Sequence, residues 1–82
     1  MLNVYILIAS MNKILIDYEF HTGLGPTYAA RLLGVAYTTY AQYRRDARVL
    51  PLYVRRHIET IQALPAEILN EQILKYAPKR DK

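Results

Sequence analysis

The sequence predicts an all-α fold, a compact bundle of four to five short helices. Apolar residues recur at helical spacing, most clearly Val54, Ile58 and Ile61 at i, i+4 and i+7. Prolines and glycines, which break helices, stand between the segments that carry such patterns. The chain has 82 residues, of which 52% are apolar and 22% charged, as in one globular domain. Because a domain of this size buries a small core, we expect dimerisation to help stabilise it.

Residues 1–10 form an apolar extension that is either a short strand or helical. Residues 4–8 are rich in strand-forming side chains, but they do not alternate, so periodicity does not separate a buried strand from a helix. The longest apolar run, residues 4–9, is far below the ~20 residues of a membrane span. A signal peptide requires a basic region before its apolar run, and none precedes this one. We therefore expect a cytoplasmic protein with no membrane segment.

The first expected helix runs from Asn12, whose side chain caps it, to about Phe20. One threonine and two glycines within residues 21–25 end this helix in a turn. The side chains that should face inward are Ile14, Leu15 and Tyr18.

Two short helices joined by a tight turn are expected next. The first runs from Pro26, which suits the first turn of a helix, to Leu33. Gly34 suits the left-handed conformation that ends a helix. The second helix then runs from about Ala36 to Arg45.

Residues 51–64 and 65–76 are expected to form the fourth and fifth helices, each opened by a proline. Residues 47–50 form the loop before them. The apolar positions of the fifth helix are Ile68, Leu69 and Ile73. The domain organisation is therefore an N-terminal extension (1–10), a helical domain (11–76) and a basic C-terminal tail (77–82).

Residues 26–45 have the spacing of a helix-turn-helix unit. Two crossing helices need a small residue at their contact, which Ala30 supplies, and the turn needs a residue tolerant of positive φ, which Gly34 supplies. An ordinary helical hairpin without a binding role is the alternative. The apolar residues that should close the seam between the two helices are Leu33, Val35, Tyr40 and Tyr43.

The stretches TYAARLLGVAYTTYAQYRR and ARVLPLYVRRHIETI resemble the Cro/repressor-type, or lambda-repressor-like, helix-turn-helix family. The resemblance spans about Asn12 to Leu64 and agrees in the order of helices. It implies a transcriptional regulator of phage or plasmid type, expected to be a repressor, that binds a near-palindromic DNA operator as a homodimer. The chain departs from the family at Asp46, where a glycine often follows the recognition helix, and in the bulk of Tyr40 and Tyr43.

The helix 36–45 is the expected recognition helix, placed in the major groove. The resemblance implies that its first residues and those one turn later reach base edges. Gln42 has the donor and acceptor that adenine requires, and the methyl group of Thr38 can meet that of thymine. The expected base-contacting residues are Tyr37, at the start of the helix, and the outer stripe of Thr38, Ala41, Gln42 and Arg45.

Basic charge is concentrated in the middle of the chain. The net charge is +4, and within residues 31–58 six arginines stand against one acidic residue, Asp46. Such a patch indicates nucleic-acid binding, with a generic solvated surface as the alternative. Thr27 is expected to cap its helix and to contact phosphate at the helix N-terminus. The expected phosphate-contacting residues are Thr27, Arg44, Arg48, Arg55 and Arg56, with Arg31 and the Tyr28 hydroxyl as weaker candidates.

Other chemistry finds little support in the sequence. His21 and His57 are isolated and the chain has no cysteine, so no metal site is expected. Asp17 and Glu19 are two residues apart on a helix, so they face different directions and are interpreted as solvated charges. No glycine-rich phosphate loop or nucleophile elbow is present. We therefore expect no enzyme, no cofactor and no small-molecule ligand.

The alternative to a DNA-binding regulator is a helical protein-interaction module, such as a phage inhibitor or antitoxin. Such a module would use the same bundle to bind a protein. For the regulator, residues 64–76 are the expected dimer surface and residues 4–8 a second candidate, because a chain of this length leaves apolar area unburied.

Overall fold

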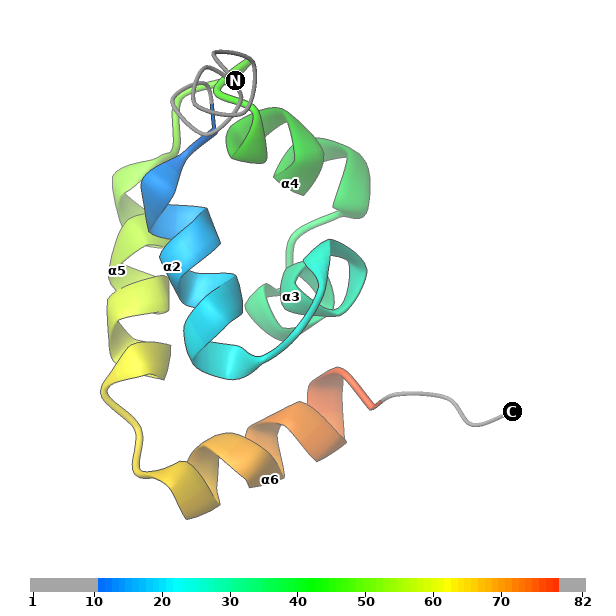
Figure 1. Cartoon of the computed structure of the whole chain (residues 1–82), viewed down its shortest axis with the longest axis vertical. Helices are drawn as coiled ribbons and strands as arrows, with labels where there is room; N and C mark the ends of the chain where they lie inside the picture. Colours follow the sequence, from blue (N-terminus) through cyan, green and yellow to red (C-terminus); the bar gives the residue numbers. More distant parts are fainter. Residues whose placement is uncertain (1–10, 79–82) are drawn as a thin grey trace, which may run out of the picture.

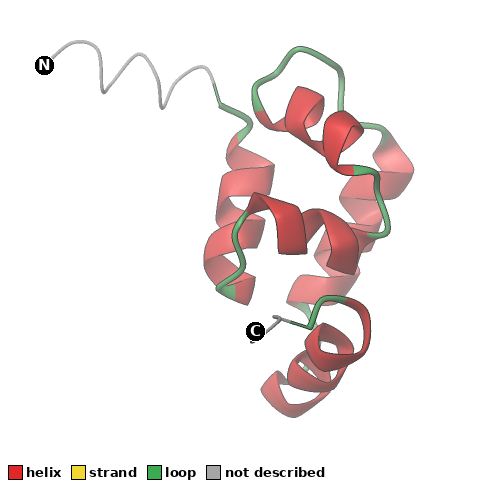
Figure 2. Cartoon of the chain, turned by 90° about the vertical axis from the view of Figure 1, so that its right-hand side faces the viewer, coloured by secondary structure: helices red, strands yellow, loops and turns green. Residues whose placement is uncertain are grey.

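The computed structural model describes residues 11–78, and every regular element in that range is an α-helix (Figure 1). The predicted all-α bundle is therefore confirmed, and loops alone join the helices (Figure 2). The predicted extension over residues 1–10 and the tail residues 79–82 lie outside the described residues. The helices of the described part are α2 (Lys13–Thr22), α3 (Pro26–Leu33), α4 (Tyr37–Arg44), α5 (Leu52–Gln62) and α6 (Ala66–Tyr76).

The helix starts follow the local chemistry. Asn12 caps α2, since its Oδ1 accepts a hydrogen bond from the N–H of Ile14 at 2.9 Å. Pro26 opens α3, and Gly25 is the N-cap residue before it. The predicted capping by Thr27 is wrong, because no side chain caps α3.

Two helices end in the same hydrogen-bond pattern, each closed by a residue with positive φ. Gly34 ends α3 with φ of 80°, and the next N–H bonds back to the Ala30 carbonyl at 3.0 Å. Asp46 follows α4 with φ of 59°, and the N–H of Ala47 bonds back to the Gln42 carbonyl at 2.8 Å. Asp46 therefore adopts the left-handed conformation at the position where the family resemblance leads us to expect a glycine. Among residues 11–78 it is the only non-glycine residue that does so.

The core lies between α2, α5 and the α3–α4 pair. α2 and α5 lie side by side, α3 packs against α4, and α6 closes one end of the molecule by packing on α3 (Figure 1). The predicted inward stripe of α5, formed by Val54, Ile58 and Ile61, is buried. Tyr18 and Tyr40 are among the largest fully buried side chains. No helix within residues 11–78 combines the length and apolar character needed to span a bilayer.

Candidate nucleic-acid interface

The α3–α4 pair is closed by the seam that the sequence predicts. Ala30 and Leu33 of α3 are buried, as are Tyr40 and Tyr43 of α4. Val35, in the turn between them, is partly buried and packs against the same core. The inward sides predicted for both helices are therefore confirmed.

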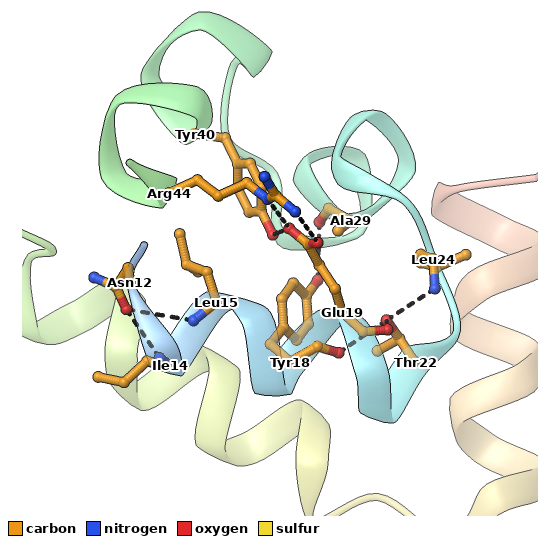
Figure 3. A network of polar contacts seen from close by, with 10 residues as sticks. All are labelled: Asn12, Ile14, Leu15, Tyr18, Glu19, Thr22, Leu24, Ala29, Tyr40 and Arg44. Carbon is orange, nitrogen blue, oxygen red and sulfur yellow. Dashed lines mark hydrogen bonds and ion pairs between the residues drawn. The ribbon is translucent and has the colours of Figure 1, made fainter. Parts of the chain in front are cut away.

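Tyr18 fixes α3 against α2. Its side chain is fully buried, and its hydroxyl donates a hydrogen bond to the Ala29 carbonyl at 2.9 Å (Figure 3). Burial raises the pKa of Tyr18 above its ordinary value, and the nearby charge of Glu19 raises it further. The hydroxyl is thus kept in the protonated form that this hydrogen bond requires.

Glu19 fixes α4 against α2. Its Oε2 accepts hydrogen bonds from the Tyr40 hydroxyl at 2.7 Å and from Arg44 Nε at 2.8 Å, and its Oε1 accepts one from Arg44 Nη2 at 3.0 Å (Figure 3). The Glu19 side chain is 11% exposed, so the interpretation of it as a solvated charge is wrong. Asp17 fits that interpretation, since it lies at the surface and pairs with Lys13 at 2.8 Å.

The same carboxylate explains how α4 accommodates Tyr40, a bulkier side chain than the family resemblance leads us to expect at this position. A buried hydroxyl without a partner would destabilise the fold, and Glu19 supplies that partner to Tyr40. Burial, and then the hydrogen bond to Glu19, raise the pKa of Tyr40 well above its ordinary value. The hydrogen bond to Glu19 also raises the pKa of Arg44. The three side chains therefore form one cluster, protonated at tyrosine and arginine.

A backbone contact joins the same two helices. The N–H of Asn12 donates a hydrogen bond to the Arg44 carbonyl at 2.8 Å. This carbonyl belongs to the last turn of α4, where no further helical N–H group is left to donate a hydrogen bond to it. The first residue before α2 and the last residue of α4 are thus held side by side.

The outer side of α4 is free of these internal contacts. The side chains of α4 advance by about 100° per residue, which places the stripe of Thr38, Gln42 and Arg45 opposite the buried tyrosines. Thr38 and Arg45 are exposed, and Gln42 is partly exposed with Ala41 beside it. Tyr37, at the start of α4, is 53% exposed. The structure therefore places four of the five predicted base-contacting residues on α4 and Arg45 directly after it, with Thr38, Gln42 and Arg45 on the outer side.

The predicted phosphate-contacting residues are divided between several places. Arg48 lies exposed in the loop that follows α4, and Thr27 lies exposed in the first turn of α3. Arg44 has its guanidinium committed to Glu19, with its side chain 27% exposed. Two of its guanidinium nitrogens, Nε and Nη2, are thus engaged in an internal ion pair, and the phosphate contact predicted for Arg44 stays a prediction.

Arg55 and Arg56 lie on α5, which Figure 1 shows on the other side of α2 from α4. Arg55 borders a shallow groove with Asp17 of α2 and Glu59 of its own helix. Two carboxylates beside an arginine weaken its attraction for phosphate. The structure therefore does not bring these two arginines together with the outer stripe of α4.

Arg31 and Tyr28, the weaker candidates, form a pair on α3. The Arg31 guanidinium carbon lies 5.3 Å from the centre of the Tyr28 ring, a cation–π contact. Tyr28 is partly buried and packs against the core. The pair lies on the exposed edge of α3, with Arg31 in its last turn.

The described residues contain no group of three or more His, Cys, Asp or Glu side chains placed to hold a metal ion. Comparisons with protein-family models, with curated proteins and with solved structures give no match for this chain. The resemblance to the Cro/repressor type therefore stays a prediction that depends on the residues quoted for it.

Sequence reasoning missed the role of Glu19. A signal was available, because eight tyrosines against one phenylalanine is an unusual aromatic set. A tyrosine predicted to face the core brings a hydroxyl that needs a partner. A tyrosine at the inward position 40 therefore predicts a hydrogen-bond acceptor on the facing helix.

Proposed function

We propose that this protein is a sequence-specific DNA-binding transcriptional regulator that acts as a homodimer. In this proposal α4 enters the major groove of a near-palindromic operator, and the protein acts by repression. The observation that carries the proposal is the arrangement of α4. Its inner side packs against α3 and is hydrogen-bonded to Glu19 of α2, whereas Thr38, Gln42 and Arg45 on its outer side are accessible to a DNA groove.

The chemistry of this outer side suits a DNA groove. Gln42 offers both a donor and an acceptor to a base edge, and Ala41 is small enough to allow close approach of the backbone. Arg45 and Arg48 are exposed at the end of α4 and in the loop after it, where they would meet phosphate or guanine. The exposed first turns of α3 and α4 add backbone N–H groups that attract phosphate.

A second candidate function, binding to a protein partner, is favoured by one specific observation. Val49 in the loop before α5, and Leu52 and Tyr53 in the first turn of α5, are exposed apolar side chains close together in the sequence, with Val49 86% exposed. Exposed apolar patches are typical of protein contact surfaces. A module that used these side chains would need no free α4 surface.

Selection of bound sequences from a random pool of DNA duplexes tests the proposal. The expected result is an enriched near-palindromic site whose half-sites are about one DNA turn, or ~34 Å, apart. The affinity for that site should fall steeply with rising salt, because arginines that neutralise phosphates release counterions. A pool without enrichment, together with binding that is absent or insensitive to salt, would contradict the proposal and favour the protein-binding alternative.

A further inference from the structure

A pocket lies between α3, α5 and α6, away from the outer side of α4. Its volume is about 360 Å³, near the lower end of the ~300–1,000 Å³ found for small-molecule sites. Gly34, at the end of α3, forms part of its wall. The lining has an apolar part and a polar part, and each part limits the chemistry of the ligand.

The apolar part consists of leucine and isoleucine side chains that belong to the edge of the core. Leu32, Leu33 and Ile61 are buried, and Leu64 is partly buried. The parts of these side chains that face the pocket offer an apolar surface that an aliphatic chain would cover. This part of the pocket therefore favours a hydrocarbon chain.

The polar part carries positive charge and no negative charge. Arg31, His57, Gln72 and Tyr76 line it, and no Asp or Glu does. Within residues 11–78, no hydrogen bond or ion pair engages any of these four side chains. The Arg31 guanidinium lies over the Tyr28 ring, with its central carbon 5.3 Å from the ring centre. This contact leaves the N–H groups at the edge of the guanidinium free to donate hydrogen bonds.

We infer that this pocket binds an aliphatic carboxylate of medium chain length. The chain lies on Leu32, Leu33 and Ile61, and the carboxylate accepts charge-assisted hydrogen bonds from Arg31. His57 and Tyr76 are further donors on the same rim. An amine of the same length would face Arg31 with like charge, and an alcohol would offer it no ion pair. The inference does not depend on DNA binding, since it rests on the pocket alone.

Titration of the full chain with octanoate, below the concentration at which it forms micelles, tests the inference by ¹⁵N–¹H NMR. The expected result is a set of saturable shifts at the amides of Leu32, Leu33, Ile61 and Leu64. Octanol should bind about tenfold more weakly, because a hydrogen bond to a charged group is lost. Octylamine should bind more weakly still. Shifts that do not saturate, or equal binding of octylamine and octanoate, would overturn the inference.

Two matched variants locate the charge that matters. Arg31→Gln should weaken octanoate binding about tenfold, whereas Arg56→Gln, which removes the same charge from the exposed outer side of α5, should bind as the parent does. Both positions are exposed, and circular dichroism of each variant checks that the helices are intact. Equal affinities of the two variants would contradict the role of Arg31 and with it the proposed orientation of the carboxylate.

Discussion

Tyr40 of α4 and Glu19 of α2 are joined by a hydrogen bond of 2.7 Å, and Arg44 binds the same carboxylate one turn further along α4. The helix whose outer side we propose to enter DNA is therefore oriented from its inner side by a residue of another helix. Tyr18, the neighbour of Glu19, holds α3 in the same way through the Ala29 carbonyl. Two adjacent residues of α2 thus set the position of both helices of the α3–α4 pair.

Replacement of Glu19 by glutamine should destabilise the fold. The variant keeps an acceptor for Tyr40 but loses the ion pair, so we expect a loss of about 1–2 kcal/mol in the free energy of unfolding. Urea denaturation of Glu19→Gln measures this loss. Asp17→Asn is the matched control, because its exposed pair with Lys13 should contribute little. Equal stability of the two variants would show that the Glu19 cluster does not hold α4.

The stability of the protein should fall as the pH rises above about 10. The pKa values of Tyr18 and Tyr40 are raised in the folded protein, so their protonated forms stabilise it fully below the unfolded value of about 10. Above that pH the unfolded chain loses these two protons while the folded protein keeps them. The free energy of unfolding should therefore fall by about 1.4 kcal/mol per pH unit for each tyrosine. Denaturant midpoints measured across this range give the slope. Tyr40→Phe should reduce the slope, and an unchanged slope would exclude Tyr40 as its source.

Asp46→Gly should stabilise the protein by about 0.5–1 kcal/mol, because glycine adopts a φ of 59° without the cost that a side chain brings. The substitution also removes a negative charge from the C-terminal end of α4, where it is unfavourable. Asp46→Ala separates the two causes, since it removes the charge and keeps the β-carbon. A gain in melting temperature for Gly without one for Ala would assign the effect to the backbone, and a loss for Gly would contradict it.

Two substitutions should separate base contacts from phosphate contacts in the proposed DNA complex. Gln42→Ala should weaken the selected site by about 1–3 kcal/mol and leave non-specific DNA nearly unaffected. Arg48→Ala should weaken both kinds of DNA alike and reduce the dependence of affinity on salt. Fluorescence anisotropy with the two duplexes measures each effect, and Arg56→Ala serves as the control on α5. Indistinguishable losses from Gln42→Ala and Arg48→Ala would refute the assigned contacts.

The helices were predictable from sequence because their ends carry strong local signals. Asn12, Pro26, Gly34, Pro51 and Pro65 each mark a boundary within one or two residues of the observed one. The inward positions were predictable for a similar reason, since apolar residues at helical spacing must face a core.

The partners of the polar side chains were not predictable in the same way. Glu19 and Arg44 are 25 residues apart, and only the crossing of α2 and α4 brings them together. Charge counting could assign both to solvent or to phosphate, because it contains no information on which helices meet. The sequence could not predict that Arg55 and Arg56 lie apart from α4 for the same reason, because their position depends on the packing of α5 against α2.

The backbone hydrogen bond from Asn12 to Arg44 has a practical consequence for labelling the protein. A dye attached at Met11, the described residue directly before Asn12, would lie near the end of α4, where it would crowd any partner of that part of the helix. A tag attached beyond α6 begins at the other end of the bundle (Figure 1). Measurements of DNA affinity should therefore use a label after α6, and a label at Met11 should serve as a proximity reporter for whatever binds near the end of α4.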